Sequence, residues 1–260
     1  GRPWHAALAA LDWQAPWYAA HAAPGRAVAA HCLAGHPLHT ALVQAAPAPV
    51  RPVSDDLLPA GRAYEQHIFE TGTVPTREGL HDFFNGLAWS LFPHTKQRLN
   101  AIQAAEIVRL GVGATRGPLR DRITVLDESG ALLYAPDALW NALAAKDWPQ
   151  AFGPLRPLWR ETQVWLLGHA LLEQLAQPRK NLTAHVWRLE SAATDSLAAD
   201  AQFAGLLDRP DTLAPASTHL PLLGVPGWHA PNTDPDFYTD RTVFRPPRDT
   251  PMRPPRAGAQ

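Results

Sequence analysis

Two clusters of polar side chains interrupt apolar stretches of the sequence, and both carry groups that bind metals or move protons. In the first, His81, Asp82 and Asn85 lie among phenylalanines and leucines, and the four-residue spacing of His81 and Asn85 places both on one helix face. In the second, His169 and Glu173 have the same spacing. Imidazole and carboxylate groups are a standard ligand set for divalent metal ions. If the two helices pack together, these residues are expected to share a site.

A third histidine, His185, lies in a predicted strand, and it could complete a divalent metal site with His81 and His169. A nearby carboxylate would then act as general base on a metal-bound water. The catalytic groups would be the other polar residues of the two clusters, Asp82, Glu173 and Asn85. The alternative is structural, because histidines and carboxylates between helices commonly form buried hydrogen-bond networks. The spacing permits both interpretations, since His/Glu pairs four residues apart also arise by chance.

A basic region follows the first cluster. Between His94 and Arg122 the chain carries six lysines and arginines against two acidic residues. Lys96 lies in the first turn of a predicted helix, where free backbone N–H groups also favour anions. Together with Arg77 and Arg120, it could bind the phosphate or carboxylate of a small anionic substrate. The alternative is a solvated helix face followed by a basic loop.

The composition excludes several classes of protein. Twenty-three basic and 24 acidic residues give a formal net charge of -1, so no general attraction to nucleic acid or to an anionic membrane is expected. No apolar run approaches the ~20 residues that span a bilayer. Cys32 is the only cysteine, which rules out an intrachain disulfide and fits a reducing compartment. We therefore expect a cytoplasmic protein. Its oligomeric state is not indicated.

The periodicity predicts an α+β fold: a mainly helical single domain with a small antiparallel β-sheet and long proline-rich irregular segments. Leu80, Phe83, Phe84, Leu87 and Leu91 recur at the three- and four-residue spacing of an amphipathic helix. Helices are expected at 60–71, 77–92, 95–110, 136–145, 158–176 and 195–207. Strands are expected at 122–126, 131–134 and 182–189, with a turn at 127–130.

Three regions of different composition divide the chain. Residues 1–54 form an Ala/Pro/His-rich segment that packs on or flanks the domain, residues 55–246 form the core domain, and residues 247–260 form a flexible Pro/Arg-rich tail.

Several ordered blocks of sequence resemble one known family. They are Val74–Asn100 (VPTREGLHDFFNGLAWSLFPHTKQRLN), Leu119–Gly130 (LRDRITVLDESG), Gly168–Glu173 (GHALLE), Leu182–His185 (LTAH), Leu220–Trp228 (LPLLGVPGW) and Phe237–Pro246 (FYTDRTVFRP). The chain is thereby identified as a member of the bacterial family of unknown function catalogued as number 3025. This resemblance implies no particular activity.

Two functions therefore remain open. The first is an enzyme, a metal-dependent hydrolase acting on a small anionic or phosphorylated substrate, with a divalent metal ion as its cofactor. The second is a non-catalytic binding or scaffold protein whose polar residues form a structural hydrogen-bond network. An open pocket that holds several of the polar groups would favour the enzyme, and a closed, fully paired network would favour the scaffold.

Overall fold

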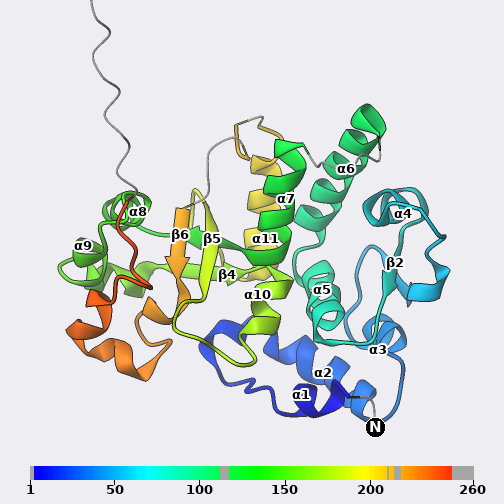
Figure 1. Ribbon diagram of the computed structural model, residues 1–260, viewed down its shortest axis with the longest axis horizontal. Coiled ribbons are helices and arrows are strands. Elements are labelled where there is room, and N and C mark those ends of the chain that lie inside the picture. Colours follow the sequence, from blue (N-terminus) through cyan, green and yellow to red (C-terminus); the bar gives the residue numbers. More distant parts are fainter. Residues whose placement is uncertain (1–2, 112–116, 210, 214–217, 248–260) are drawn as a thin grey trace, which may run out of the picture.

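The computed structural model describes residues 3–111, 117–209, 211–213 and 218–247 (Figure 1). Its α-helices are α1 (His5–Ala9), α2 (Ala22–Leu33), α3 (Leu38–Ala45), α4 (Tyr64–Thr71), α5 (Leu80–Leu91), α6 (Pro93–Leu110), α7 (Pro118–Ser129), α8 (Asp137–Ala144), α9 (Trp148–Phe152), α10 (His169–Gln174) and α11 (Ser196–Leu206). Its strands are β1 (Arg51–Ser54), β2 (Thr73–Thr76), β3 (Gly130–Tyr134), β4 (Gln163–Leu166), β5 (Thr183–Arg188) and β6 (Thr218–Pro221). Short 3-10 helices connect them at Pro16–Tyr18, Asp55–Leu57, Arg156–Glu161, Leu222–Gly224, Ala230–Thr233 and Pro235–Thr239.

A four-stranded sheet in the order β4-β3-β5-β6 forms the centre of the molecule. β3 pairs antiparallel with β4 and parallel with β5, and β5 pairs antiparallel with β6. β1 and β2 form a separate parallel pair. The α+β class is confirmed. The expected antiparallel sheet is instead mixed, because the chain crosses from β3 to its parallel neighbour β5 through β4 and α10.

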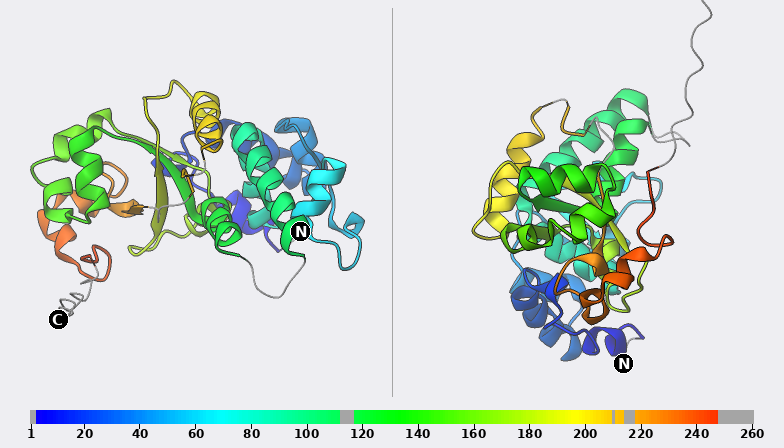
Figure 2. Two further views of the ribbon diagram at one scale, coloured as in Figure 1. Left: turned by 90° about the horizontal axis from the view of Figure 1, so that it is seen from above. Right: turned by 90° about the vertical axis from the view of Figure 1, so that its left-hand side faces the viewer.

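Both faces of the sheet are covered. Side chains alternate along a strand, so Ala131 and Leu133 of β3 belong to one apolar cluster and Leu132 belongs to another. The first cluster includes α8, α9 and the C-terminal 3-10 helices. The second includes α7 and α11. Figure 2 shows the sheet between these two groups of helices.

The first fifty residues are part of the main core. Leu8, Val28 and Leu42 from α1 to α3 share the first cluster with Phe83 and Phe84 of α5. The Tyr18 hydroxyl donates a hydrogen bond to the Leu172 carbonyl of α10 at 2.9 Å. The N-terminal segment therefore supports two of the helices that carry the polar clusters.

Several predicted elements are confirmed near their expected bounds. The helix expected at 195–207 is α11, and Asp195 caps it by accepting from the Ala198 backbone N–H at 2.8 Å. α4 ends as expected at Gly72, which adopts the left-handed conformation. The helices expected at 95–110 and 136–145 are α6 and α8, and the strand expected at 182–189 is β5.

Other predictions are wrong. Residues 122–126, expected as a strand, lie in α7, and no turn separates α7 from β3 because one begins where the other ends. The helix expected at 158–176 is three elements: a 3-10 helix, β4 and α10. The helix expected at 77–92 begins only at Leu80, because the preceding residues up to Thr76 form β2. A separate finding concerns membranes. None of the described helices has the length and apolar character needed to cross a bilayer.

Candidate metal centre

A cavity of about 460 Å³ opens between α4, α5, α6, α7 and α10. Its wall contains most of the polar residues that the sequence marks as candidates. These are Arg77, His81, Asp82, Asn85, Lys96 and His169. Tyr64, Asp127 and Glu128, which are not among the predicted site residues, also line the wall. The predicted meeting of the two polar clusters is therefore present, and it lies at an accessible hollow.

A close backbone contact places His169 in this cavity. The backbone N–H groups of Leu167 and Gly168 both donate to the Gly130 carbonyl, at 3.1 and 2.8 Å. A Cβ atom on Gly168 would lie 2.5 Å from the Gly130 nitrogen and 2.6 Å from the Ser129 Cα, so only glycine fits. The first residue of α10 is thereby held against the last turn of α7, which carries Asp127 and Glu128.

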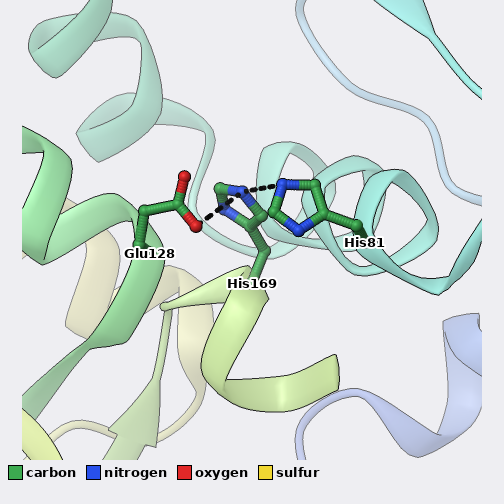
Figure 3. A group of neighbouring side chains, drawn as sticks. All are labelled: His81, Glu128 and His169. Carbon is green, nitrogen blue, oxygen red and sulfur yellow. Dashed lines mark hydrogen bonds and ion pairs between the residues drawn. The ribbon is translucent and has the colours of Figure 1, made fainter. Parts of the chain in front are cut away.

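The two histidines face each other through the same ring atom. Nε2 of His81 lies 3.0 Å from Nε2 of His169, and the rings are nearly perpendicular. Glu128 approaches from α7, with Oε2 3.7 Å from Nε2 of His169. Figure 3 shows the three side chains converging from three helices.

A carboxylate lies behind each ring. Oε2 of Glu173 is 3.2 Å from Nδ1 of His81, and Oδ2 of Asp127 is 3.8 Å from Nδ1 of His169. A histidine that binds a metal through Nε2 commonly directs its Nδ1–H at a carboxylate, which fixes the ring and raises its basicity. His81 has this arrangement with Glu173, and Asp127 lies on the corresponding side of His169 but beyond hydrogen-bond distance.

The two carboxylates influence where the imidazole protons lie. Glu173 favours a proton on Nδ1 of His81, which leaves a lone pair on Nε2. If His169 donated to that lone pair through Nε2–H, its buried Nδ1 would carry a lone pair beside the Asp127 carboxylate. If His169 carries its proton on Nδ1, two lone pairs face each other across 3.0 Å. That second arrangement requires a positive charge between the rings, which a proton or a metal ion supplies.

The protonation of His169 suits a metal ligand. Its side chain is only 4% exposed, and Nδ1 has no hydrogen-bond partner among the described residues. Burial lowers the pKa of His169 to about 4, and the attraction of Asp127 only partly opposes this effect. The ring is therefore neutral at physiological pH, the form in which imidazole binds metals.

One donor atom from each of His81, Glu128 and His169 lies within 4.8 Å of the other two. Donors around a tetrahedral zinc ion at normal bond lengths are about 3 to 3.5 Å apart. The histidine nitrogens already meet this spacing. Glu128 is 41% exposed, so its side chain can close the remaining gap by changing rotamer.

Lys96 extends a second polar network from the same cavity. Its ammonium group is buried, forms an ion pair with Asp127, and donates to Oδ1 of Asn85 at 2.9 Å. Asn85 in turn donates to the Tyr64 hydroxyl at 3.3 Å. Burial is the largest effect on Asp127 and would raise its pKa, but the charge and hydrogen bond of Lys96 together with the neighbouring histidines outweigh it, so the net pKa is lowered. Asp127 therefore stays negative beside His169.

The structure assigns different positions to several residues expected to act in catalysis or binding. Asp82 is buried at the start of α5, where Oδ2 accepts from the Arg77 backbone N–H at 2.6 Å, and its carboxylate also binds the Arg77 side chain. Asn85 holds Lys96, and Glu173 holds His81. Each of these three contacts holds another side chain or backbone group in place.

Two expected site residues lie elsewhere. His185 of β5 does not line the cavity; its ring lies 4.7 Å from that of His219 on β6. Arg120 also lies outside the cavity wall, buried in α7 with Nε unpaired. Lys96 and Arg77 both line the cavity, each paired with a carboxylate, but Arg120 does not, so the three expected cations do not converge. The third candidate ligand beside His81 and His169 is Glu128, in place of the expected His185. The sequence pattern predicts Glu128 in a turn, next to Asp127.

Comparison with known proteins gives a family and no activity. Residues 50–248 match the family model described as "Protein of unknown function (DUF3025)". No curated protein and no solved structure matches the chain. The matched segment covers most of the 260 residues and includes every residue of the centre described above. The chain belongs to the DUF3025 family.

Proposed function

We propose that the protein is a metal-dependent hydrolase whose divalent ion is held by His81, His169 and Glu128. The observation that carries the proposal is the pair of facing Nε2 atoms, each on a ring with a carboxylate behind it. Carboxylates behind both rings favour a proton on each Nδ1, which leaves the two Nε2 lone pairs facing one position where a metal ion can bind.

The number of ligands favours catalysis over a structural role for the ion. Structural zinc sites are closed by four protein ligands, whereas catalytic sites have three and leave a position for water or substrate. Here the three donors lie in the wall of a cavity of about 460 Å³, within the range of small-molecule sites. A bound divalent ion would act as a Lewis acid and lower the pKa of a coordinated water.

The neighbouring residues have separate roles in this proposal. Glu173 and Asp127 orient the two imidazoles. Lys96 keeps Asp127 negative and in place, and Asn85 fixes Lys96. Glu128 lies in the last turn of α7, where the helix dipole disfavours a negative charge. A cation bound to Glu128 would offset this unfavourable interaction.

The charge of the cavity changes the expected substrate. Its wall contains five carboxylate residues, Asp55, Glu65, Asp82, Asp127 and Glu128, against the two cations Arg77 and Lys96. Both cations are already paired with wall carboxylates. We therefore propose a small polar substrate that is neutral or positively charged, with a hydrolysable ester or amide bond, in place of the expected phosphorylated one.

Hydrolysis by the metal-loaded chain tests the function. Neutral and cationic esters and amides are compared with phosphate monoesters of the same leaving group, with and without a chelator. We expect turnover of the former class that is lost in His169→Gln and in the chelated protein, and retained in His185→Gln, a histidine outside the cavity. Activity unchanged by His169→Gln, or no turnover of any class by metal-loaded protein, contradicts the proposal.

A further inference from the structure

A second cavity, of about 690 Å³, lies between α9 and the C-terminal 3-10 helices. We call it the aromatic cavity, because Trp148, Phe152, Tyr238 and Phe244 line it. Figure 2 shows α9 and this C-terminal segment at the opposite end of the molecule from α4 and α6. The aromatic cavity is therefore separate from the metal centre, and nothing proposed for one depends on the other.

The aromatic walls are rigid and flat. The rings of Phe152 and Tyr238 stack at 4.6 Å with an angle of 17° between their planes. Trp148 meets Phe244 edge to face at 6.2 Å. Buried aromatic rings that already pack against each other offer apolar surface with little loss of side-chain freedom on binding. Such walls fit a flat apolar group.

The charged groups around this cavity all have the same sign. Lys146, Arg156 and Arg241 line it, and its wall contains no aspartate or glutamate. Among the ion pairs of the described residues, none involves these three side chains. Arg156 donates to the Tyr238 hydroxyl at 2.8 Å and to the Asn232 carbonyl at 3.2 Å, both of which are neutral. The guanidinium is thus held in a fixed orientation, also over the Tyr238 ring, and no carboxylate of the described residues pairs with it.

Two further features mark the same wall. The Asn232 side chain is fully buried; its amide N–H₂ group donates to the Leu223 and Val225 carbonyls at 2.9 and 2.7 Å, and its Oδ1 is left without a donor. Unsatisfied buried acceptors are rare in native proteins and call for an unseen partner. Lys146 has a φ of 56°, an unfavourable conformation for a residue other than glycine or asparagine.

We propose that the aromatic cavity binds a small organic anion, a carboxylate or phosphate attached to a flat apolar ring. The anionic group would lie against Arg156 and Lys146, since a planar guanidinium pairs well with either oxyanion. The ring would lie along the Phe152 and Tyr238 stack. Residues 248–260 carry three arginines and one aspartate, so their net charge has the same sign as the cavity and does not complement it.

Binding of a simple probe pair to the full chain tests this proposal. The probes are 2-naphthoate and the neutral 2-naphthalenemethanol, measured by calorimetry in the presence of chelator so that the metal centre is empty. We expect the naphthoate to bind at least about tenfold more tightly than the alcohol, because a charge-assisted pair forms only with the anion. We expect 2-naphthyl phosphate to bind as the carboxylate does.

Two variants separate binding from folding. Arg156→Gln is expected to weaken naphthoate binding about tenfold, and Lys146→Gly to weaken it by a smaller factor while relieving the positive φ, so that the fold is retained. Arg209→Gln, which removes an exposed arginine on another part of the chain, serves as the matched control and is expected to bind normally. Equal binding of the acid and the alcohol, no saturable binding at millimolar probe, or full binding by both cavity variants would overturn the proposal.

Discussion

Glu173 lies behind His81, with Oε2 3.2 Å from the Nδ1 atom that faces away from the candidate metal position. The four-residue spacing of His169 and Glu173 suggested two ligands on one helix. The structure instead directs Glu173 across to the histidine of α5, so that α10 supplies one ligand and the support for the other. Each imidazole of the centre thus has a carboxylate from a different helix behind it.

This relationship predicts the effect of removing Glu173. Glu173→Ala should weaken metal binding by about 10- to 100-fold, the usual cost of losing a carboxylate behind a metal-binding histidine. Glu173→Gln should lose less, because the amide oxygen still accepts from Nδ1–H. Competition with a chromogenic chelator measures both affinities. Equal affinity in wild type and Glu173→Ala would show that Glu173 does not position His81.

The close backbone contact at Gly168 predicts that a substitution there also weakens metal binding, by moving the helix that carries His169. Gly168→Ala should displace α10 from the end of α7, since its Cβ would meet backbone atoms of Gly130 and Ser129. We expect lower stability together with weaker metal binding. The matched control is Gly205→Ala in α11, where a Cβ meets nothing within 4 Å; it should raise stability by up to about 1 kcal/mol. Thermal unfolding measures the stability of both variants, and the chelator competition measures their metal affinity. Weaker metal binding in Gly168→Ala but not in Gly205→Ala would show that the position of α10 matters, and not the added methyl group as such.

Lys96 and Asp127 form a mostly buried ion pair, so removing one partner should lower the free energy of unfolding. Lys96→Met leaves Asp127 without its cation, and because Asp127 retains 24% side-chain exposure we expect a loss of about 2 to 3 kcal/mol, below that of a fully buried pair. The double variant Lys96→Met/Asp127→Leu should recover part of this loss, since replacing both partners leaves no unpaired charge. Urea unfolding measures the free energy of unfolding of the wild type, the single variant and the double variant. An unchanged free energy of unfolding in Lys96→Met would contradict the assignment of a buried pair.

His21 predicts a dependence of stability on pH. It lies at the start of α2, is 1% exposed and has neither ring nitrogen hydrogen-bonded, and burial lowers its pKa to about 4. Between pH 6.5 and 4 the unfolded chain therefore binds a proton that the folded chain does not. The contribution of His21 to stability is fully present above pH 6.5 and falls by about 3 kcal/mol as the pH falls through this window. Urea unfolding across the range should show a shallower loss in His21→Leu; an identical loss would assign the effect to other groups.

Part of the fold follows from local sequence. α5 follows from its three- and four-residue apolar spacing, α11 from its Asp195 cap, and the boundary between α5 and α6 from Pro93. Because α5 is a helix, His81 and Asn85 do share the face that lines the cavity.

The misassigned elements depend on tertiary contacts. Ile123, Thr124 and Val125 are β-branched and favour a strand locally. Ile123 and Leu126, three residues apart, instead bury one helical face in the cluster with α11, and this packing decides the outcome. The same misassignment placed Asp127 and Glu128 in a turn, so Glu128 was missed as a ligand. At Gln163–Leu166, pairing with β3 selects the strand β4, and no local pattern reveals that partner.

The most direct test of the metal centre is the stoichiometry of Zn²⁺ and Mn²⁺ binding to chelator-treated protein, measured by calorimetric titration. The centre predicts one ion per chain, at least about 100-fold weaker binding in His81→Gln and His169→Gln, and unchanged binding in His185→Gln. No binding of either ion by the wild-type chain, or binding that His81→Gln and His169→Gln leave intact, would contradict a metal centre at these residues.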